Sequence, residues 1–103
     1  LRDHPATVEW WGGQFASGRT DPTDAIIETV RRAASNRIGR DPEIYGGPYG
    51  SDLRLLTGLA GIPTVQFGPG DTSYAHAPNE HVVIEDVVTC AVTLADVIVD
   101  FCR

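Results

Sequence analysis

Residues 50–67 read GSDLRLLTGLAGIPTVQF, and they give the plainest indication of the fold class. Ser51 or Asp52 can cap a helix, because each side chain offers an oxygen to a backbone N–H of the first turn. Apolar residues then recur at helical spacing until Gly61, which is placed like the glycine that ends many helices. Residues 63–67 follow as a predicted strand. A helix leading directly into a strand is typical of a layered α/β fold.

Two further helices flank this unit. Asp21 can cap a helix that begins with Pro22, whose fixed φ suits the first helical position, and Gly39 closes it. A last amphipathic stripe repeats at helical spacing from Ile84 to Phe101. The three predicted helices start near Pro22, Ser51 and Ile84.

Two more segments are strand candidates. Residues 7–11 carry β-branched and aromatic side chains, and residues 42–45 lead into the glycine-rich residues 46–50. Together with residues 63–67 they give an alternation of strands and helices, which predicts an α/β fold. In such folds the loops after the carboxyl ends of strands bear ligands, and residues 46–50 and 68–81 both have that position.

The composition excludes several classes of protein. The 103 residues carry a net charge of −6, and all eight basic residues are scattered arginines, so the basic cluster of a nucleic-acid binder is lacking. No stretch approaches the roughly 20 continuous apolar residues of a membrane span. We therefore expect no nucleic-acid partner and no membrane partner. The chain opens at Leu1 and contains no methionine, which suggests a piece of a longer protein.

The two cysteines give no indication of a disulfide. Cys90 and Cys102 are twelve residues apart in one helical pattern. Twelve helical residues correspond to about 18 Å, which is far beyond the reach of a disulfide bond. Cys102 falls on the apolar stripe, so we expect it to be a buried thiol. Since nothing argues for an oxidising compartment, the expected location is cytoplasmic.

The loop of residues 68–81 concentrates titratable side chains. His76 lies between two alanines, and a proline follows, so its imidazole would project from a restrained backbone. A histidine in such a loop is most often solvated or hydrogen-bonded, and metal ligation is the functional alternative. Asn79 or Glu80 could then accept a hydrogen bond from the second ring nitrogen of a ligating histidine.

Three segments resemble motifs of the M20 family of metallopeptidases. Residues 61–70, GIPTVQFGPG, and residues 75–82, AHAPNEHV, together resemble the closing motif of that family. Residues 50–54, GSDLR, resemble its Gly-Ser/Thr-Asp-Ala-Arg element, with leucine in place of the alanine. The order and spacing of the motifs also match, so the resemblance covers the chain from about Asp21 to its end.

The resemblance implies a two-domain enzyme with a layered α/β catalytic domain and a smaller lid domain that mediates homodimerisation. Residues 1–20 would form the last strand of the lid domain and a linker, and residues 21–103 the C-terminal part of the catalytic domain. The family site holds two zinc ions, with cobalt as an alternative metal. By motif position His76 ligates one zinc ion. The other ligands and the general base belong to upstream motifs, so no catalytic residue is assigned in this chain.

The resemblance also implies the reaction, which is hydrolysis of an amide bond next to a carboxylate in a small N-acyl amino acid or peptide. Gly50, Ser51 and Asp52 are candidate substrate-binding residues, because backbone N–H groups at a helix start can hold a carboxylate or an oxyanion. Ser51 or Asp52 can equally serve only as a helix cap. One histidine cannot form a dinuclear site, so we expect the chain alone to be inactive.

The alternative hypothesis is a non-catalytic α/β module that binds a small anionic ligand or a protein partner through its glycine-rich loops. It stays open because no upstream ligand motif is present in these 103 residues. Under the enzyme hypothesis, a sheet interrupted partway through the fold would leave apolar side chains uncovered. Trp10 and Trp11 would point to opposite sides of a strand, so one can pack on a core while the other faces a partner.

Overall fold

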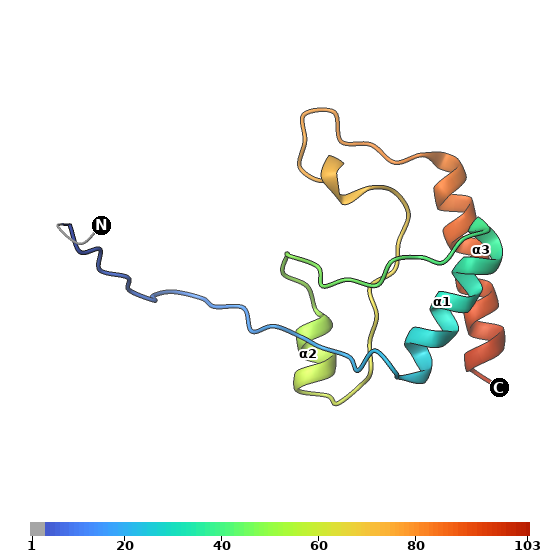
Figure 1. Ribbon diagram of the computed structural model, residues 1–103, viewed down its shortest axis with the longest axis horizontal. Coiled ribbons are helices and arrows are strands. Elements are labelled where there is room, and N and C mark those ends of the chain that lie inside the picture. The colour runs from blue at the N-terminus through green and yellow to red at the C-terminus, as the bar shows by residue number, and fades with distance from the viewer. Residues whose placement is uncertain (1–3) are drawn as a thin grey trace.

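Helices are the regular structure of this chain, and long irregular segments connect them. The computed structural model describes residues 4–103 (Figure 1). Its elements are α1 (Ala25–Ile38), α2 (Leu53–Gly58), the short 3-10 helix η1 (Thr72–Tyr74) and α3 (Ile84–Phe101). All three predicted helices are therefore present. No β-strand is formed within residues 4–103, so the α/β fold class is not confirmed.

The strands predicted at residues 7–11, 42–45 and 63–67 are irregular segments in the structure. The physical reason is a lack of partners, because a strand is stable only when neighbouring strands satisfy its backbone N–H and C=O groups. Thr64 obtains such contacts from a side chain. Its N–H donates to Thr20 Oγ1 at 2.9 Å, and its carbonyl oxygen accepts from the same hydroxyl. The Thr20 side chain thus satisfies two backbone groups of Thr64 that a neighbouring strand would otherwise pair.

The start of α1 differs from the prediction by three residues. Asp24 caps the helix in place of Asp21, since its carboxylate accepts the N–H two residues later at 3.0 Å. Asp21 instead accepts the N–H of Thr23 at 2.9 Å, and this hydrogen bond lowers the pKa of Asp21. Gly39 ends α1 as predicted, in the left-handed conformation with φ at 71°. The predicted start of α3 at Ile84 is also confirmed.

The helices α1 and α3 run antiparallel and form the core (Figure 1). The buried side chains on their facing sides are Ile27, Val30, Ala33 and Ala34 of α1 and Cys90, Thr93 and Val97 of α3. Several are small, which lets the two helices approach closely. Thr93 is fully buried, and its hydroxyl is satisfied by the carbonyl of Thr89 at 2.8 Å. Val65 and Phe67 pack on this core, so the segment after α2 is attached to it.

Two ion pairs join the helices and define their register. Arg37 donates to Asp96 from Nε and Nη2 at 2.7 and 2.9 Å, and Arg32 donates to Asp100 at 3.1 Å. Hydrogen bonding from Arg37 lowers the pKa of Asp96. These side chains are partly exposed, and exposed ion pairs add little to stability. Their main effect is to favour one alignment of α1 against α3.

The buried thiol belongs to Cys90, and the prediction for Cys102 is wrong. Cys90 is buried between the helices, whereas Cys102 is exposed. Cys102 lies on the predicted apolar stripe with Ile98 and Phe101, and that stripe is exposed. The buried side of α3 carries Cys90, Thr93 and Val97 instead. Within residues 4–103, no helix has both the length and the apolar character needed to cross a membrane.

Apolar surface is widely exposed, as predicted. Trp10 and Trp11 are 83 % and 86 % exposed, and Leu59 is 83 % exposed. The N-terminal segment extends away from the helices in Figure 1. The radius of gyration is 17.8 Å, compared with about 13 Å for a compact domain of 100 residues. The described residues therefore bury only a small core, and both tryptophans lie outside it.

Candidate functional site

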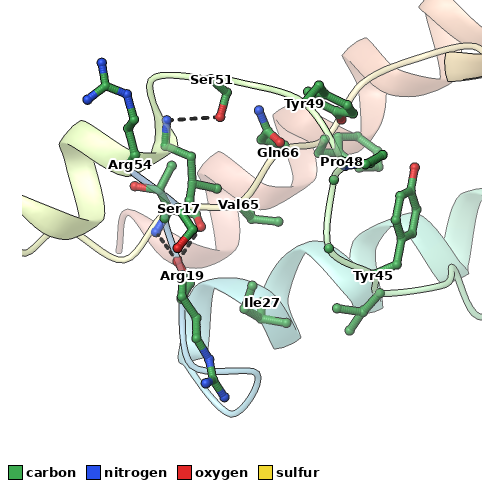
Figure 2. A pocket seen from close by; sticks show the side chains of 18 of the residues that line it. Ser17, Arg19, Ile27, Tyr45, Pro48, Tyr49, Ser51, Arg54, Val65 and Gln66 are labelled. Atoms are coloured by element: carbon green, nitrogen blue, oxygen red, sulfur yellow. Dashed lines mark hydrogen bonds between the residues drawn. The ribbon is translucent and has the colours of Figure 1, made fainter. Parts of the chain in front are cut away.

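A large cavity lies beside α1 and the start of α2. Its volume is about 820 Å³, which is within the range of small-molecule pockets. Most of its lining comes from residues 15–20, 42–51 and 64–67. Figure 2 shows Tyr45 and Tyr49 on one side and Arg54 on the opposite side. The cavity thus brings together a glycine-rich loop and part of the GSDLR motif.

The predicted substrate-binding residues lie directly before α2. Gly50 and Ser51 line the cavity, whereas Asp52 does not. Ser51 Oγ accepts the N–H of Leu53 at 3.3 Å, so Ser51 serves as the side-chain cap in this structure. Asp52 occupies the N-cap position without a side-chain cap bond and is exposed. Because α2 has only six residues, its dipole gives little support to anion binding.

Residues 15–20 cross the first turn of α2 in backbone contact. A Cβ atom at Gly18 would lie 2.7 Å from both the N and the Cα atom of Arg54, and 2.5 Å from Cδ2 of Leu53. Two residues later, Thr20 is joined to Thr64 by the pair of hydrogen bonds described above. The crossing segment is therefore held at two points, on α2 and on the segment that follows it.

Phe15 and Arg54 form the edge of the cavity next to Gly50. The guanidinium carbon of Arg54 lies 4.9 Å from the centroid of the Phe15 ring, which is a cation–π contact. The same ring would lie 3.6 Å from a Cβ atom at Gly50. The Nε of Arg54 is buried and has no hydrogen-bond partner among residues 4–103. Arg54 is thus held by its stacking on Phe15, and its Nε–H can still donate a hydrogen bond.

The loop that carries His76 is a separate region and does not line the cavity. Three backbone hydrogen bonds of 3.1 Å close successive turns in it, from Ala75 to Thr72, from Ala77 to Tyr74 and from Glu80 to Ala77. Asp71 caps η1 by accepting the N–H of Ser73 at 2.8 Å. This backbone hydrogen bond lowers the pKa of Asp71. The loop is therefore shaped by its own turns.

His76 has an unusual backbone conformation. Its φ is 61°, and it is the one non-glycine residue with a positive φ in the described part of the chain. The left-handed conformation is uncommon for residues with a Cβ atom, although histidine adopts it more often than most. Such outliers cluster at sites that bind ligands, where the surroundings hold them. The His76 side chain is exposed, so its imidazole is accessible.

The two residues predicted to support His76 are seen bonding only through their backbone groups, and not to His76. The carbonyl oxygen of Asn79 pairs with Nδ1 of His81 at 2.6 Å, and the N–H of Glu80 bonds to the carbonyl of Ala77. His81 packs locally on Tyr74, with ring centroids 4.4 Å apart. Across residues 4–103, no three His, Cys, Asp or Glu side chains come together to hold a metal ion. A metal ion at His76 would therefore need ligands from outside these residues.

Four residues that shape the cavity were not assigned an individual role from the sequence. They are Phe15, Gly18, Thr20 and Arg54. The first three lie in the segment assigned to the lid strand and linker, and Arg54 appeared only as part of the GSDLR motif. Their contacts join distant parts of the chain, and Thr20 and Thr64 are 44 positions apart. Helical and strand periodicity describe neighbours within a few residues, so they carry no signal for such pairs.

Comparison with known proteins gives a family match. The sequence model of peptidase family M20/M25/M40 matches residues 4–100. Over 105 residues the chain is 37 % identical to acetylornithine deacetylase from Myxococcus xanthus, which covers 99 % of this chain and 26 % of that protein. It is 26 % identical over 111 residues to N-formyl-4-amino-5-aminomethyl-2-methylpyrimidine deformylase from Halalkalibacterium halodurans, covering 100 % of this chain and 26 % of that protein.

A third relative is an uncharacterized metallohydrolase from Methanocaldococcus jannaschii. It is 35 % identical over 72 residues, which cover 70 % of this chain and 17 % of that protein. The chain spans about a quarter of the length of the deacetylase and of the deformylase. No solved structure matches the chain. The family match includes both the GSDLR segment and the loop of His76.

Proposed function

The chain belongs to peptidase family M20/M25/M40, and from this premise we propose that it is one part of a metal-dependent enzyme that hydrolyses an amide bond. The observation that carries the proposal is the family match over residues 4–100. Two similar proteins are a deacetylase and a deformylase by name. The proposed substrate is therefore a small N-acyl amino acid or a peptide-like amide.

The proposed metal is zinc, with two ions per active site and cobalt as an alternative. His76 would supply one ligand, because a neutral imidazole is a preferred zinc ligand and this one is exposed on a restrained backbone. Zinc, when bound, polarises a carbonyl group and lowers the pKa of a bound water. Asn79 or Glu80 would accept a hydrogen bond from the second ring nitrogen of His76 and fix the orientation of the ring.

Gly50, Ser51 and Asp52 are the proposed substrate-binding residues. The cavity lined by Gly50 and Ser51 supports this role. Because Ser51 Oγ accepts from Leu53, its O–H remains able to donate to a carboxylate or carbonyl oxygen of the substrate. The carboxylate of Asp52 makes no cap bond and can accept from a substrate N–H.

Residues 1–20 are proposed to belong to a lid domain and linker, and residues 21–103 to the C-terminal part of a layered α/β catalytic domain. The irregular segments would pair with strands of the rest of the protein, which would satisfy their backbone groups. The exposure of Trp10 and Trp11 supports a covering partner at that end. A homodimer formed through the lid is the corresponding assembly. A cytoplasmic location suits the two free cysteines.

The test compares the full-length protein with the 103-residue chain. We expect the full-length protein to bind two zinc ions, measured by elemental analysis, and to hydrolyse N-acetyl-L-ornithine or another N-acyl amino acid. A chelator should abolish hydrolysis, and zinc or cobalt should restore it. The 103-residue chain should hydrolyse none of these substrates, because one histidine cannot form the site.

Hydrolysis that persists after complete metal removal would contradict the proposal. A full-length protein that neither binds zinc nor hydrolyses any N-acyl amino acid would favour the alternative. In that case the chain would be part of a non-catalytic module that binds a small anionic ligand or a protein partner.

A further inference from the structure

We propose that Gly18 is a positioning residue for the cavity wall formed by Ser51, Leu53 and Arg54. By allowing residues 15–20 to cross α2 in backbone contact, Gly18 sets where Ser51, Asp52 and Arg54 lie. This inference rests on the proposed function, because that function assigns substrate binding to the same wall. It adds a residue from outside the motifs, located 33 positions before Ser51 in the sequence.

The first step is steric, because only glycine fits at position 18. A Cβ atom there would lie 2.5 Å from Cδ2 of Leu53 and 2.7 Å from the N and Cα atoms of Arg54. The leucine side chain can rotate away, but the other two atoms belong to the backbone of α2. Gly18 is not among the glycines with a positive φ, so space and not backbone conformation requires the glycine. Any side chain would therefore push α2 and the crossing segment apart.

The second step is that α2 moves more readily than the crossing segment. Thr20 holds the segment to Thr64 through two hydrogen bonds, and the next residue, Val65, packs on the core formed by α1 and α3. The segment is therefore tied to the core and has little freedom to move outward. In contrast, α2 has six residues and none of them is buried. The strain of a larger side chain would therefore displace the start of α2.

The third step joins this displacement to the proposed site. Ser51 and Asp52 directly precede the first residue of α2, and Arg54 lies within its first turn, so the shift moves all three. In enzyme sites, a misplacement of about 1 Å can cost about a hundredfold in rate. The loop of His76 does not line this cavity, so metal binding should be unaffected.

The experiment is Gly18→Ala in the full-length protein, with Gly13→Ala as the matched control. A Cβ atom at Gly13 would have nothing within 4 Å, and Gly13 also lacks a positive φ. We expect Gly18→Ala to raise KM for N-acetyl-L-ornithine by about tenfold or more, with unchanged zinc content. Amide hydrogen exchange of residues 53–56 in the substrate-free protein should also become faster. Gly13→Ala should match the wild type in all three measurements.

A second pair of variants tests the same crossing if Gly18→Ala does not fold. Thr20→Val removes the hydroxyl but keeps the shape of the side chain, whereas Thr20→Ser keeps the hydroxyl. KM should rise for Thr20→Val and stay near the wild-type value for Thr20→Ser.

Two results would overturn the positioning role of Gly18. One is an equal KM for Gly18→Ala and Gly13→Ala together with an equal KM for Thr20→Val and Thr20→Ser. The other is a loss of zinc that accompanies every loss of activity. A wild-type protein that hydrolyses no N-acyl amino acid would instead reject the proposed function. The exchange rates of residues 53–56 would then still decide whether Gly18 positions α2.

Discussion

The helix pair and the cavity wall of this chain are held in place by different kinds of interaction. Between them, α1 and α3 bury four and three side chains, respectively. The helix α2 buries none, and its position depends on the close contact at Gly18 and on the hydrogen bonds of Thr20. Apolar burial is non-directional and spread over many atoms, whereas the contacts of the wall are few and directional. Stability and the geometry of the cavity wall are therefore separable in this chain.

The loop of His76 extends the comparison, because its hydrogen bonds join residues close in sequence and not distant segments. Its shape comes from hydrogen bonds between residues close in sequence, such as those of Asp71 with Ser73 and of Ala77 with Tyr74. Changing a side chain in this loop should therefore affect the proposed metal binding and leave the packing of α1 against α3 unchanged. The same separation predicts that core substitutions alter stability without altering metal content.

The largest effect is expected for His76→Ala in the full-length protein. Losing the proposed metal-ligand contact should lower turnover by at least about a hundredfold, since residues that only support metal ligands already cost up to about that much when changed. Zinc content should fall below the proposed two ions, while the thermal midpoint stays unchanged because an exposed imidazole buries little apolar area. His81→Ala is the control, since His81 lies in the same loop, contacts Tyr74 and the Asn79 carbonyl, and is not a proposed metal ligand. Near-normal turnover and full zinc content in His76→Ala would remove the basis of the metal assignment.

A smaller effect is expected for Val97→Ala in the core of the 103-residue chain. The variant loses two buried methyl groups from a side chain that is 8 % exposed. The free energy of unfolding should fall by about 2 kcal/mol. Val99→Ala, on the same helix but 65 % exposed, should change it by less than about 0.5 kcal/mol. Urea unfolding followed by circular dichroism measures both values, and equal effects would show that Val97 is not a core residue.

The smallest effect concerns the turn next to His76. The hydrogen bond from the Ser73 N–H lowers the pKa of Asp71 below 3.8. A lowered pKa in the folded state means that this support is complete above about pH 4 and is lost as the pH falls through the lowered pKa. Protection of the Ser73 amide from hydrogen exchange, measured by NMR, should follow this titration.

The matched variant for this titration is Asp71→Asn. It retains an accepting oxygen but cannot titrate, so Ser73 protection should no longer depend on pH between about pH 5 and pH 2. A pH dependence that persists in the variant would assign the titration to another group.

The elements predicted well are those whose cause lies within a few residues. The apolar stripe from Ile84 to Phe101 predicted α3, and Gly39 ends α1 because a glycine adopts the left-handed conformation without a Cβ penalty. The start of α1 was misplaced because Asp21 and Asp24 both offer a suitable carboxylate, and only the folded chain shows which one caps. The motif loop identified His76 as a candidate, but not its positive φ.

By itself, the sequence determined the helices, the family and the candidate residues, since these depend on local spacing and on motifs. Only the tertiary structure decided that Gly18 touches Arg54 and that Thr20 pairs with Thr64. It also showed that the described segments form no sheet and that Cys90, not Cys102, is buried. The physical reason is that such contacts join residues tens of positions apart, where the path of the folded backbone decides which groups meet.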